Sequence, residues 1–342
     1  MKTLRIILYS LAVIVVIAIV AGFIFISGIK RGALPKYSGE LSLKGLSGEV
    51  KVYRDERGMP HIYAADEHDL YYAVGYVMAQ ERLWQMDLIR RATTGRLSEI
   101  FGEDFLKADM YLRSLDMTNK SKMVLKDSDP VILDAMKAYC DGVNNYIDLA
   151  GKKLPPEFRI LGYKPDPWKL EDLANIIGYM GWDLAKWNLD ADIENYQLVE
   201  KFGLEKANEL IPDWKAVSSF VFPGFGLDDA TLKNVTNMLK SLDKVEAAGI
   251  TAFSGSNNWA VAGRKTWTGK PVLSNDMHLA LASPGIWIQM HQVIPGKLNV
   301  TGVVVPGEPF VVCGHNERVA WGMTNLMVDD IDLYLEKINP AD

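Results

Sequence analysis

The sequence has little of several features that mark common protein classes. It holds two cysteines, Cys140 and Cys313, too few for a disulfide-stabilised scaffold or a cysteine-based zinc site, and we expect both to be buried free thiols. Charges of both signs are mixed along the chain and sum to −6, which argues against a nucleic-acid partner. The sequence shows no repeats, no low-complexity tracts and no Gly-x-Ser-x-Gly elbow, the turn that exposes the serine of many hydrolases.

The N-terminal segment differs in kind from the rest. No charged residue occurs from Ile6 to Ile26, and basic residues flank both ends of this run. About 20 apolar residues can span a bilayer, and the run exceeds the core of about 7–15 residues of a cleaved signal peptide. We therefore predict a membrane anchor or signal segment in residues 1–33, and cleavage near Ala21-Gly22 would give a secreted product.

The composition, with 49% hydrophobic and 10% aromatic residues, supports one large or two medium-sized domains. Residues 40–53 alternate like strands, whereas an apolar stripe with helical spacing starts at Asp69. Further helices are expected from Pro130 and over residues 170–187. Residues 227–248 form a polar, helix-prone stretch, which is either a spacer lying across a site or an ordinary surface helix. Strands are predicted over residues 259–262, 271–273, 286–293, 300–305, 310–312 and 332–335, with a polar loop at residues 274–279.

The segment Gly255-Ser256-Asn257-Asn258-Trp259 carries the strongest chemical signal. A serine hydroxyl is a weak nucleophile until a base removes its proton. A serine that becomes N-terminal brings its own base, because the free α-amine has a pKa near ~8. Gly255 has no Cβ, so the Ser256 hydroxyl can attack the carbonyl behind it and cleave the chain. Alone, the segment is also typical of a polar turn before a strand.

Three ordered blocks of residues give this segment a context. The first spans residues 53–99, with Tyr53-Arg54-Asp55-Glu56-Arg57-Gly58-Met59-Pro60-His61-Ile62 and Gly95-Arg96-Leu97-Ser98-Glu99. The second continues from Gly255 to Leu273-Ser274-Asn275-Asp276-Met277-His278-Leu279. The third holds Gly314-His315-Asn316, Ala320-Trp321-Gly322-Met323-Thr324-Asn325 and Asp329-Asp330-Ile331-Asp332. Together the blocks resemble the penicillin acylase family of N-terminal nucleophile hydrolases.

This resemblance implies an α+β protein with the four-layer αββα core of those hydrolases and a largely helical α region. Residues 34–215 would form the α-chain region, 216–255 a spacer or propeptide, and 256–342 the start of the catalytic β chain. Cleavage between Gly255 and Ser256 would give an αβ heterodimer. In the family a second oxyanion donor and further metal ligands follow downstream of these blocks, so we expect residues 1–342 to be a fragment that is inactive alone.

The resemblance also assigns catalytic roles. Ser256 would be the nucleophile, its amine the base, and His278 a residue that holds the amine; the backbone N–H of Asn325 would be one oxyanion donor. Family members with histidine at this place are similar to cephalosporin and acyl-homoserine-lactone acylases, whereas penicillin G acylases carry glutamine there. Without the flanking match, His278 would be read as a structural hydrogen-bonding residue and Asn325 as the end of a strand.

The resemblance further implies a structural calcium ion. Its ligands would be Asp192, Asp329, the carbonyl of Ile331 and Asp332, since hard oxygen ligands suit Ca²⁺. Two aspartates three residues apart are also common on solvated loops. Beside the motifs, three apolar side chains suggest an acyl pocket: Leu279, Cys313 and Met323.

Two histidines and three arginines outside the motif core are predicted to be structural. His61 and His315 have no neighbour in the sequence at metal-ligand spacing. The arginines are expected to cap helix ends and pair with nearby acids, rather than bind an anionic substrate: Arg90, Arg91 and Arg96, with Asp87 or Glu99 as partners.

The sequence therefore predicts a self-processing amidohydrolase that removes an acyl group from a small-molecule amine, such as an acylated β-lactam or an acyl-homoserine lactone. It would be anchored in a membrane facing outside, or be secreted or periplasmic. Two alternatives stay open. One is a catalytically inactive, membrane-tethered binding protein of the same fold, and the other is a lactone- or peptide-cleaving hydrolase on the same scaffold.

Overall fold

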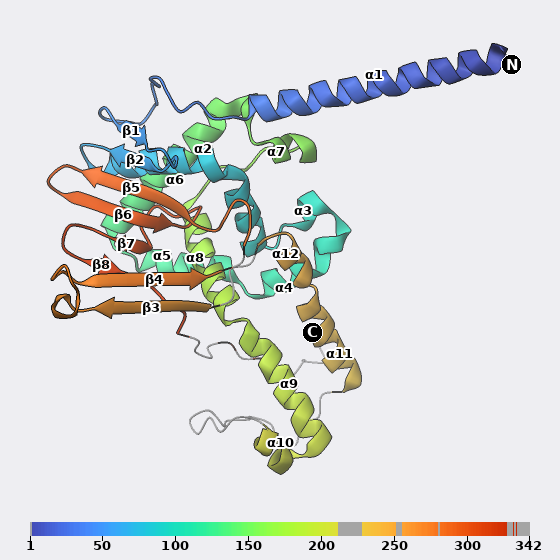
Figure 1. The fold of residues 1–342 in the computed structure, drawn as a ribbon. Coiled ribbons are helices and arrows are strands. Elements are labelled where there is room, and N and C mark those ends of the chain that lie inside the picture. The colour runs from blue at the N-terminus through green and yellow to red at the C-terminus, as the bar shows by residue number, and fades with distance from the viewer. Residues whose placement is uncertain are drawn as a thin grey trace. The chain divides into compact units, whose positions relative to one another are not determined.

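The structure is a computed structural model, and it describes residues 2–210, 228–250, 255–279, 281–326, 331 and 333. Its elements are labelled along the chain in Figure 1. The chain divides into two compact units, which are described separately. Unit 1 comprises Met1–Asp87, Pro130–Lys169 and His291–Asn299, and unit 2 comprises Leu88–Asp129, Leu170–Met290 and Val300–Asp342.

Unit 1 starts with the long helix α1 (Lys2–Gly32). The stretch Arg5–Ile24 within it is long and apolar enough to cross a membrane, by length and composition, and none of that stretch is buried against the protein. This agrees with the sequence prediction of an apolar N-terminal segment. An anchor and a signal sequence share these properties.

The strands of unit 1 begin later than expected. Residues 40–53 were predicted to alternate as strands, but strand structure is confined to β1 (Lys51–Arg54). The residues before it form turns, in which Gly39 and Gly45 adopt positive φ, a conformation that favours glycine. β1 pairs antiparallel with β2 (Pro60–Tyr63), and β2 pairs in parallel with β5 (Ile288–Ile294).

Helix α2 (Glu67–Thr93) confirms the predicted stripe, because Leu70, Val74 and Met78 on it are fully buried. It crosses α6 (Pro130–Ala150), which begins at the predicted proline. A Cβ added to Gly75 of α2 would lie 2.1 Å from the carbonyl oxygen of Tyr139 on α6. The two backbones are therefore in direct contact there, closer than side chains would allow. The remaining helices of this unit are η2 (Gly151–Lys153) and α7 (Pro156–Leu161).

Unit 2 holds most of the helices, as expected for the α region. α5 packs against α8, and α8 ends at Ala185, close to the predicted end at residue 187. The elements are α3 (Ser98–Phe101), η1 (Glu103–Phe105), α4 (Leu106–Ser114), α5 (Met117–Lys126), α8 (Leu170–Ala185), α9 (Trp187–Phe202), α10 (Leu204–Leu210), α11 (Asp229–Lys240) and α12 (Asp243–Ala247).

The three arginines form ion pairs at helix ends, as predicted. Arg91 and Arg96 both bind Glu99, each at 2.8 Å. Arg90 lies 3.5 Å from Asp172 on α8, a partner that the sequence did not indicate. These side chains therefore form ion pairs that connect helices and turns within unit 2.

The stretch before Gly255 folds as the two helices α11 and α12, in agreement with its helical pattern. In unit 2 the end of this stretch is tied to α8, because the Tyr179 hydroxyl donates to the carbonyl of Ile250 at 2.8 Å. Val245 and Ile250 are buried, and Lys186 binds Glu246 at 2.6 Å. Its role as a spacer stays a prediction.

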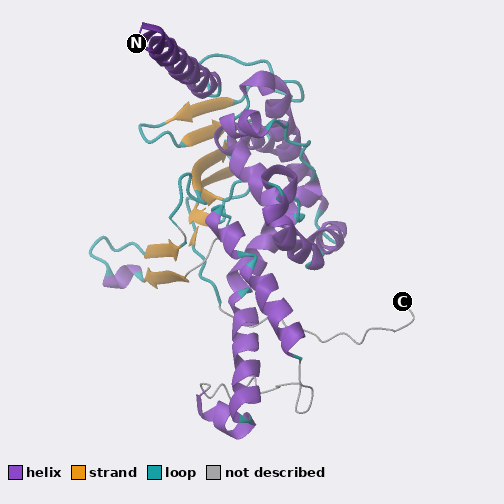
Figure 2. Cartoon of the chain, turned by 90° about the vertical axis from the view of Figure 1, so that its right-hand side faces the viewer, coloured by secondary structure: helices purple, strands orange, loops and turns teal. Residues whose placement is uncertain are grey.

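The strands form two sheets. One has the order β1-β2-β5-β6-β7-β8, and the other is the pair β3-β4. β3 and β4 make an antiparallel hairpin with the short helix η3 (Gly263–Lys265) in its loop (Figure 2). The strands not yet given bounds are β3 (Gly255–Val261), β4 (Val272–His278), β6 (Leu298–Val304), β7 (Cys313–His315) and β8 (Ala320–Trp321).

The largest differences from the predicted strand boundaries lie at three places. The expected polar loop after Leu273 is strand up to His278, and β3 starts at Gly255 instead of Trp259. Continuous pairing from Gly255 opposite His278 to Val261 opposite Val272 overrides the weak strand propensity of these polar residues. The strand expected at residues 310–312 instead starts at Cys313. The strand expected at 332–335 falls mostly outside the described residues. The helix-rich α region and strand-rich end together confirm the α+β class.

Candidate active site

The structure brings the predicted nucleophile and the predicted backbone donor together. Ser256 is the second residue of β3 and is half-buried. Its Oγ accepts a hydrogen bond from the backbone N–H of Asn325, 69 residues further along the chain, at 3.2 Å. An N–H that reaches the serine hydroxyl also lies close to where an oxyanion would form after attack.

The side chain of Asn325 fixes the position of that backbone N–H. Its Nδ2 donates to the carbonyl of Leu184, near the end of α8, at 3.0 Å. This bond satisfies a carbonyl at a helix C-terminus, where intrahelical partners are missing. Sequence reasoning assigned a role only to the backbone N–H of Asn325 and missed this anchor of its side chain to α8.

His278 ends β4 directly opposite Gly255. Its Nε2 lies 3.0 Å from Oδ2 of Asp276 and 3.3 Å from Nδ2 of Asn257. The shorter contact, with the Asp276 carboxylate, pairs with the tautomer that carries the proton on Nε2, and in that tautomer Nδ1 is an acceptor. A Cβ added to Gly255 would lie 3.9 Å from that Nδ1, so the Nδ1 edge of the ring faces Gly255.

Asn275 connects the hairpin to the segment that carries Asn325. Its Oδ1 accepts from the N–H of Met323 at 3.0 Å and its Nδ2 donates to the carbonyl of Met323 at 2.8 Å. The approach requires a glycine at Gly322, because a Cβ there would lie 2.8 Å from the Asn275 side chain. Asn275 and Gly322 both lie within the sequence motifs. The contact between the Asn275 side chain and the Met323 backbone spans 48 residues, so no local sequence pattern indicates it.

The three suggested acyl-pocket residues lie in different surroundings. Cys313 is buried, and its Sγ is 3.7 Å from Sδ of Met277, the residue opposite Ser256 in the hairpin. Burial raises the pKa of the Cys313 thiol, while a hydrogen bond with the Met323 backbone lowers it. Leu279 is half-buried and the Met323 side chain is 54% exposed. Met277 is thus an apolar neighbour of the site that the sequence reading missed.

The implied calcium ligands are only partly described. Asp192 lies half-buried on α9, Asp329 and Asp332 fall outside the described residues, and Ile331 is described as a single isolated residue. Their joint geometry therefore stays a prediction.

A cluster of Asp66, His68 and Asp69 in unit 1 has ligand atoms within 4.8 Å of one another. The buried Asp69 carboxylate already accepts the backbone N–H groups of Ser47 and Gly48 at 2.8–3.1 Å. We therefore read Asp69 as the group that fastens this turn to the start of α2.

His61 has a partner that the sequence did not reveal. Within unit 1, its Nδ1 lies 2.9 Å from Nδ1 of His291 on β5, and its Nε2 lies 3.9 Å from Asp55. His291 in turn places Nε2 2.7 Å from Oδ1 of Asn299. The other histidine predicted to be structural, His315, lies 3.3 Å from the carbonyl of the next residue.

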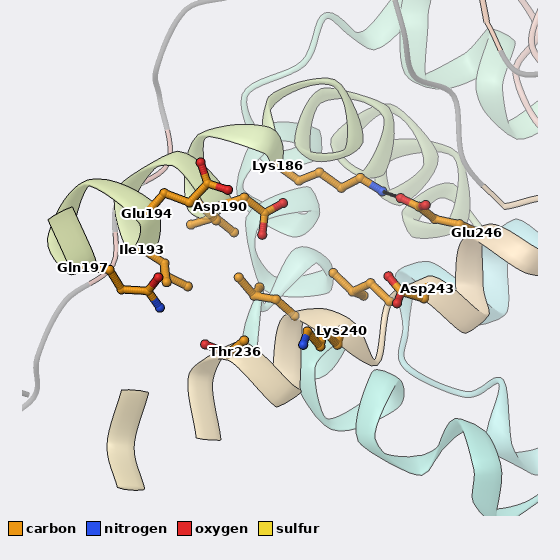
Figure 3. A pocket seen from close by; sticks show the side chains of 12 residues that line it. Lys186, Asp190, Ile193, Glu194, Gln197, Thr236, Lys240, Asp243 and Glu246 are labelled. Atoms are coloured by element: carbon orange, nitrogen blue, oxygen red, sulfur yellow. Dashed lines mark hydrogen bonds and ion pairs between the residues drawn. The ribbon is translucent and has the colours of Figure 1, made fainter. Parts of the chain in front are cut away.

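An open cavity of about 390 Å³ lies in unit 2 between α9 and the α11–α12 helices (Figure 3). Asp190 and Glu194 line it from α9, opposite Asp243. Burial raises the pKa of Asp190, and the nearby charge of Glu194 adds to this, while Lys186 opposes it. None of the predicted catalytic residues lines this cavity.

Comparison with known proteins identifies the family. The sequence model of the family described as penicillin amidase matches residues 49–342. This chain belongs to the penicillin amidase family. That membership agrees with the predicted α+β fold of N-terminal nucleophile hydrolases.

Relatives of this family member carry acylase names. This chain is 33% identical over 311 residues to the acyl-homoserine lactone acylase QuiP of Pseudomonas aeruginosa, and the match covers 90% of this chain and 36% of that protein. It is 35% identical over 324 residues to the penicillin acylase 2 proenzyme of Pseudomonas sp. strain SE83, covering 90% and 40%. The chain thus spans about two fifths of the length of these relatives.

A solved structure is also similar. Penicillin G acylase from Alcaligenes faecalis matches with a TM-score of 0.44 and 26% identity, covering 52% of this chain and 97% of that one.

Proposed function

We propose that this chain belongs to a self-processing amidohydrolase in which Ser256 is the nucleophile. The observation that carries the proposal is the hydrogen bond from the Asn325 N–H to Ser256 Oγ at 3.2 Å, at the start of a strand where His278 faces Gly255. Family membership and the acylase names of relatives support the same chemistry.

The uncut chain holds Ser256 in an inactive form. Its nitrogen is part of a peptide bond and has no free electron pair to act as a base. Attack of Ser256 Oγ on the Gly255 carbonyl forms an ester as the peptide nitrogen leaves as an amine, and water then hydrolyses the ester to a Gly255 carboxylate. The freed amine has a pKa near ~8. His278, whose Nδ1 lies 3.9 Å from a Cβ added to Gly255, would hold this amine.

The mature site would then cleave a substrate amide in two steps. The Ser256 amine takes the proton of Oγ as Oγ attacks the acyl carbonyl, and that proton passes to the departing amine. The Asn325 N–H donates to the oxyanion that forms. Water attacks the resulting acyl-serine ester, releases the acid and restores the hydroxyl. We propose N-acylated small amines as substrates, with acylated β-lactams and acyl-homoserine lactones as the first to test, because relatives are named for them.

The test is mass spectrometry of the native protein and its variants. We expect a fragment that begins at Ser256, its loss in Ser256→Ala, and normal cleavage in the control Ser274→Ala, which changes a serine on the neighbouring strand of the same hairpin. The cut protein should hydrolyse a chromogenic acyl anilide. Uncut native protein without such activity would overturn the proposal and favour a binding protein of the same fold.

Three further parts of the proposal need separate tests. We propose that the cut chains stay together as an αβ heterodimer, which co-purification of both fragments checks. A structural calcium ion at Asp192, Asp329, Ile331 and Asp332 predicts a lower unfolding temperature in a calcium chelator, restored by added Ca²⁺. An anchor in α1 predicts that the protein stays with membranes in alkaline carbonate, whereas release would indicate a cleaved signal.

A further inference from the structure

Three polar side chains lie on one face of the β3–β4 hairpin in unit 2. Asp276 and His278 are two residues apart on β4, so their side chains point to the same face of the strand. Asn257 on β3 is the direct cross-strand partner of Asp276, and residues directly opposite each other share a face. The strand register therefore gathers a carboxylate, a carboxamide and an imidazole at one place on the hairpin.

Both neighbours of His278 approach the same ring nitrogen. Its Nε2 lies 3.0 Å from Oδ2 of Asp276 and 3.3 Å from Nδ2 of Asn257. A carboxylate oxygen only accepts hydrogen bonds, whereas the amide nitrogen of asparagine only donates them. A neutral imidazole has one protonated nitrogen and one acceptor, so Nε2 can bond with Asp276 or with Asn257, but not with both. The two contacts therefore favour opposite tautomers of His278.

The tautomer determines what the other edge of the ring can do. Nδ1 faces Gly255, because a Cβ added to that glycine would lie 3.9 Å from it. In the proposed processing step the bond from Gly255 to Ser256 is cut, which frees the Ser256 amine. With the ring proton on Nε2, Nδ1 can accept a hydrogen bond from this amine, and with the proton on Nδ1 it cannot. An uncharged amine that donates to Nδ1 keeps its electron pair for the proton of the serine hydroxyl.

The charge of Asp276 decides between the two tautomers. Its contact with Nε2 is the shorter one, and a hydrogen bond to an ionised group is about twice as strong as a neutral one. We propose that Asp276 is a positioning residue that acts through His278: its carboxylate accepts from the Nε2–H, keeps Nδ1 an acceptor and so orients the Ser256 amine as the general base. The inference rests on the proposed function and adds to it the residue that directs these hydrogen bonds.

The exposure of the pair limits the size of the effect. In a Ser-His-Asp triad, where the aspartate is buried, loss of the carboxylate costs about 10⁴ in kcat because the histidine takes the wrong tautomer. The side chain of Asp276 is 72% exposed and that of His278 is 46% exposed, so water competes for the same hydrogen bond. We therefore expect a loss of about tenfold in kcat, with KM little changed because neither residue is proposed to bind the substrate.

The experiment measures hydrolysis of a chromogenic acyl anilide by the full-length protein, per mole of chain that begins at Ser256. Asp276→Ala should lower kcat about tenfold, because the remaining contact, with Asn257, favours the other tautomer. Asp276→Glu should restore part of the activity, and so should adding Asn257→Ala to Asp276→Ala, since this removes the competing donor. The control Asp148→Asn removes an exposed carboxylate from α6 and should match the native protein.

Three kinetic results would overturn the proposal. The first is full activity in Asp276→Ala. The second is a double variant that is no faster than Asp276→Ala, because the amide of Asn257 would then not compete for Nε2. The third is an equal loss in Asp148→Asn, which would assign the effect to net charge.

Nitrogen chemical shifts of His278 separate this inference from the proposed function, because they require no turnover. In the Ser256→Ala protein, which cannot cut itself, the proton of neutral His278 should lie on Nε2, and adding Asp276→Ala should move it to Nδ1. The same tautomer in both proteins would contradict the inference. If the native protein neither cuts itself nor hydrolyses any anilide, the proposed function fails, and the chemical shifts still decide whether Asp276 sets the tautomer.

Discussion

Replacing Gly75 with alanine should destabilise the protein, although alanine is the better helix former. In an open helix interior this change stabilises by about 1 kcal/mol. In α2, however, the new methyl would lie 2.1 Å from the carbonyl oxygen of Tyr139 and 2.9 Å from its carbonyl carbon. These are backbone atoms of α6, which cannot rotate aside, so the two helices must separate. Overpacking costs about 1–3 kcal/mol, and contact with backbone places this case at the upper end. The expected net loss is about 2 kcal/mol.

The matched control is Gly178→Ala on α8, an exposed glycine inside a helix with nothing within 4 Å of the added Cβ. It should gain up to about 1 kcal/mol. Both variants are compared by urea unfolding followed through tryptophan fluorescence, in the Ser256→Ala background so that cleavage does not complicate the transition. If Gly75→Ala matches or exceeds the unaltered protein while the control rises, α2 and α6 do not touch through their backbones, and the argument fails.

Two other predictions concern titratable groups. Burial and the charge of Glu194 raise the pKa of Asp190 in the folded protein. Ionisation of Asp190 therefore opposes folding above the unfolded pKa of about 3.9. Asp190→Asn should raise the urea midpoint at pH 7, and this gain should vanish as the pH falls to about 4. A gain that persists at low pH would contradict the electrostatic cause. For the histidine pair of unit 1, Asn299 Oδ1 accepts from His291 Nε2, which leaves His291 Nδ1 to accept from His61 Nδ1. Nitrogen chemical shifts should show the proton of neutral His61 on Nδ1, and the opposite tautomer would refute the arrangement.

Local patterns determined much of the chain from sequence alone. Three features depend on neighbours within a few residues: the apolar run of α1, the buried stripe of α2 and the start of α6 at Pro130. Helical periodicity and proline geometry act over such distances, so they can be read directly. The motif around Ser256 was recognised in the sequence because three ordered blocks of residues give it a context; alone, the segment is also typical of a polar turn.

Strand boundaries were harder to predict from the sequence, because pairing with a neighbouring strand, rather than the strand propensity of each residue, sets them. Ser274 to His278 read as a polar loop, yet cross-strand bonds to β3 make this stretch a strand. A residue's own preference for strand is weak compared with the environment its partner supplies. The register of the whole hairpin determines which residue lies opposite on the neighbouring strand.

Tertiary structure alone decided how the candidate site is held together. The Asn325 N–H meets Ser256 because its side chain reaches Leu184, and Asn275 binds the backbone of Met323. These contacts join residues 48–141 positions apart, and a sequence carries no local periodicity that records such pairs. The buried carboxyl of Glu308, whose Oε1 has no hydrogen-bond partner among the described residues, is the same kind of fact. Glutamate is ordinarily exposed, so the sequence does not predict that Glu308, in the loop between the paired strands β6 and β7, is buried.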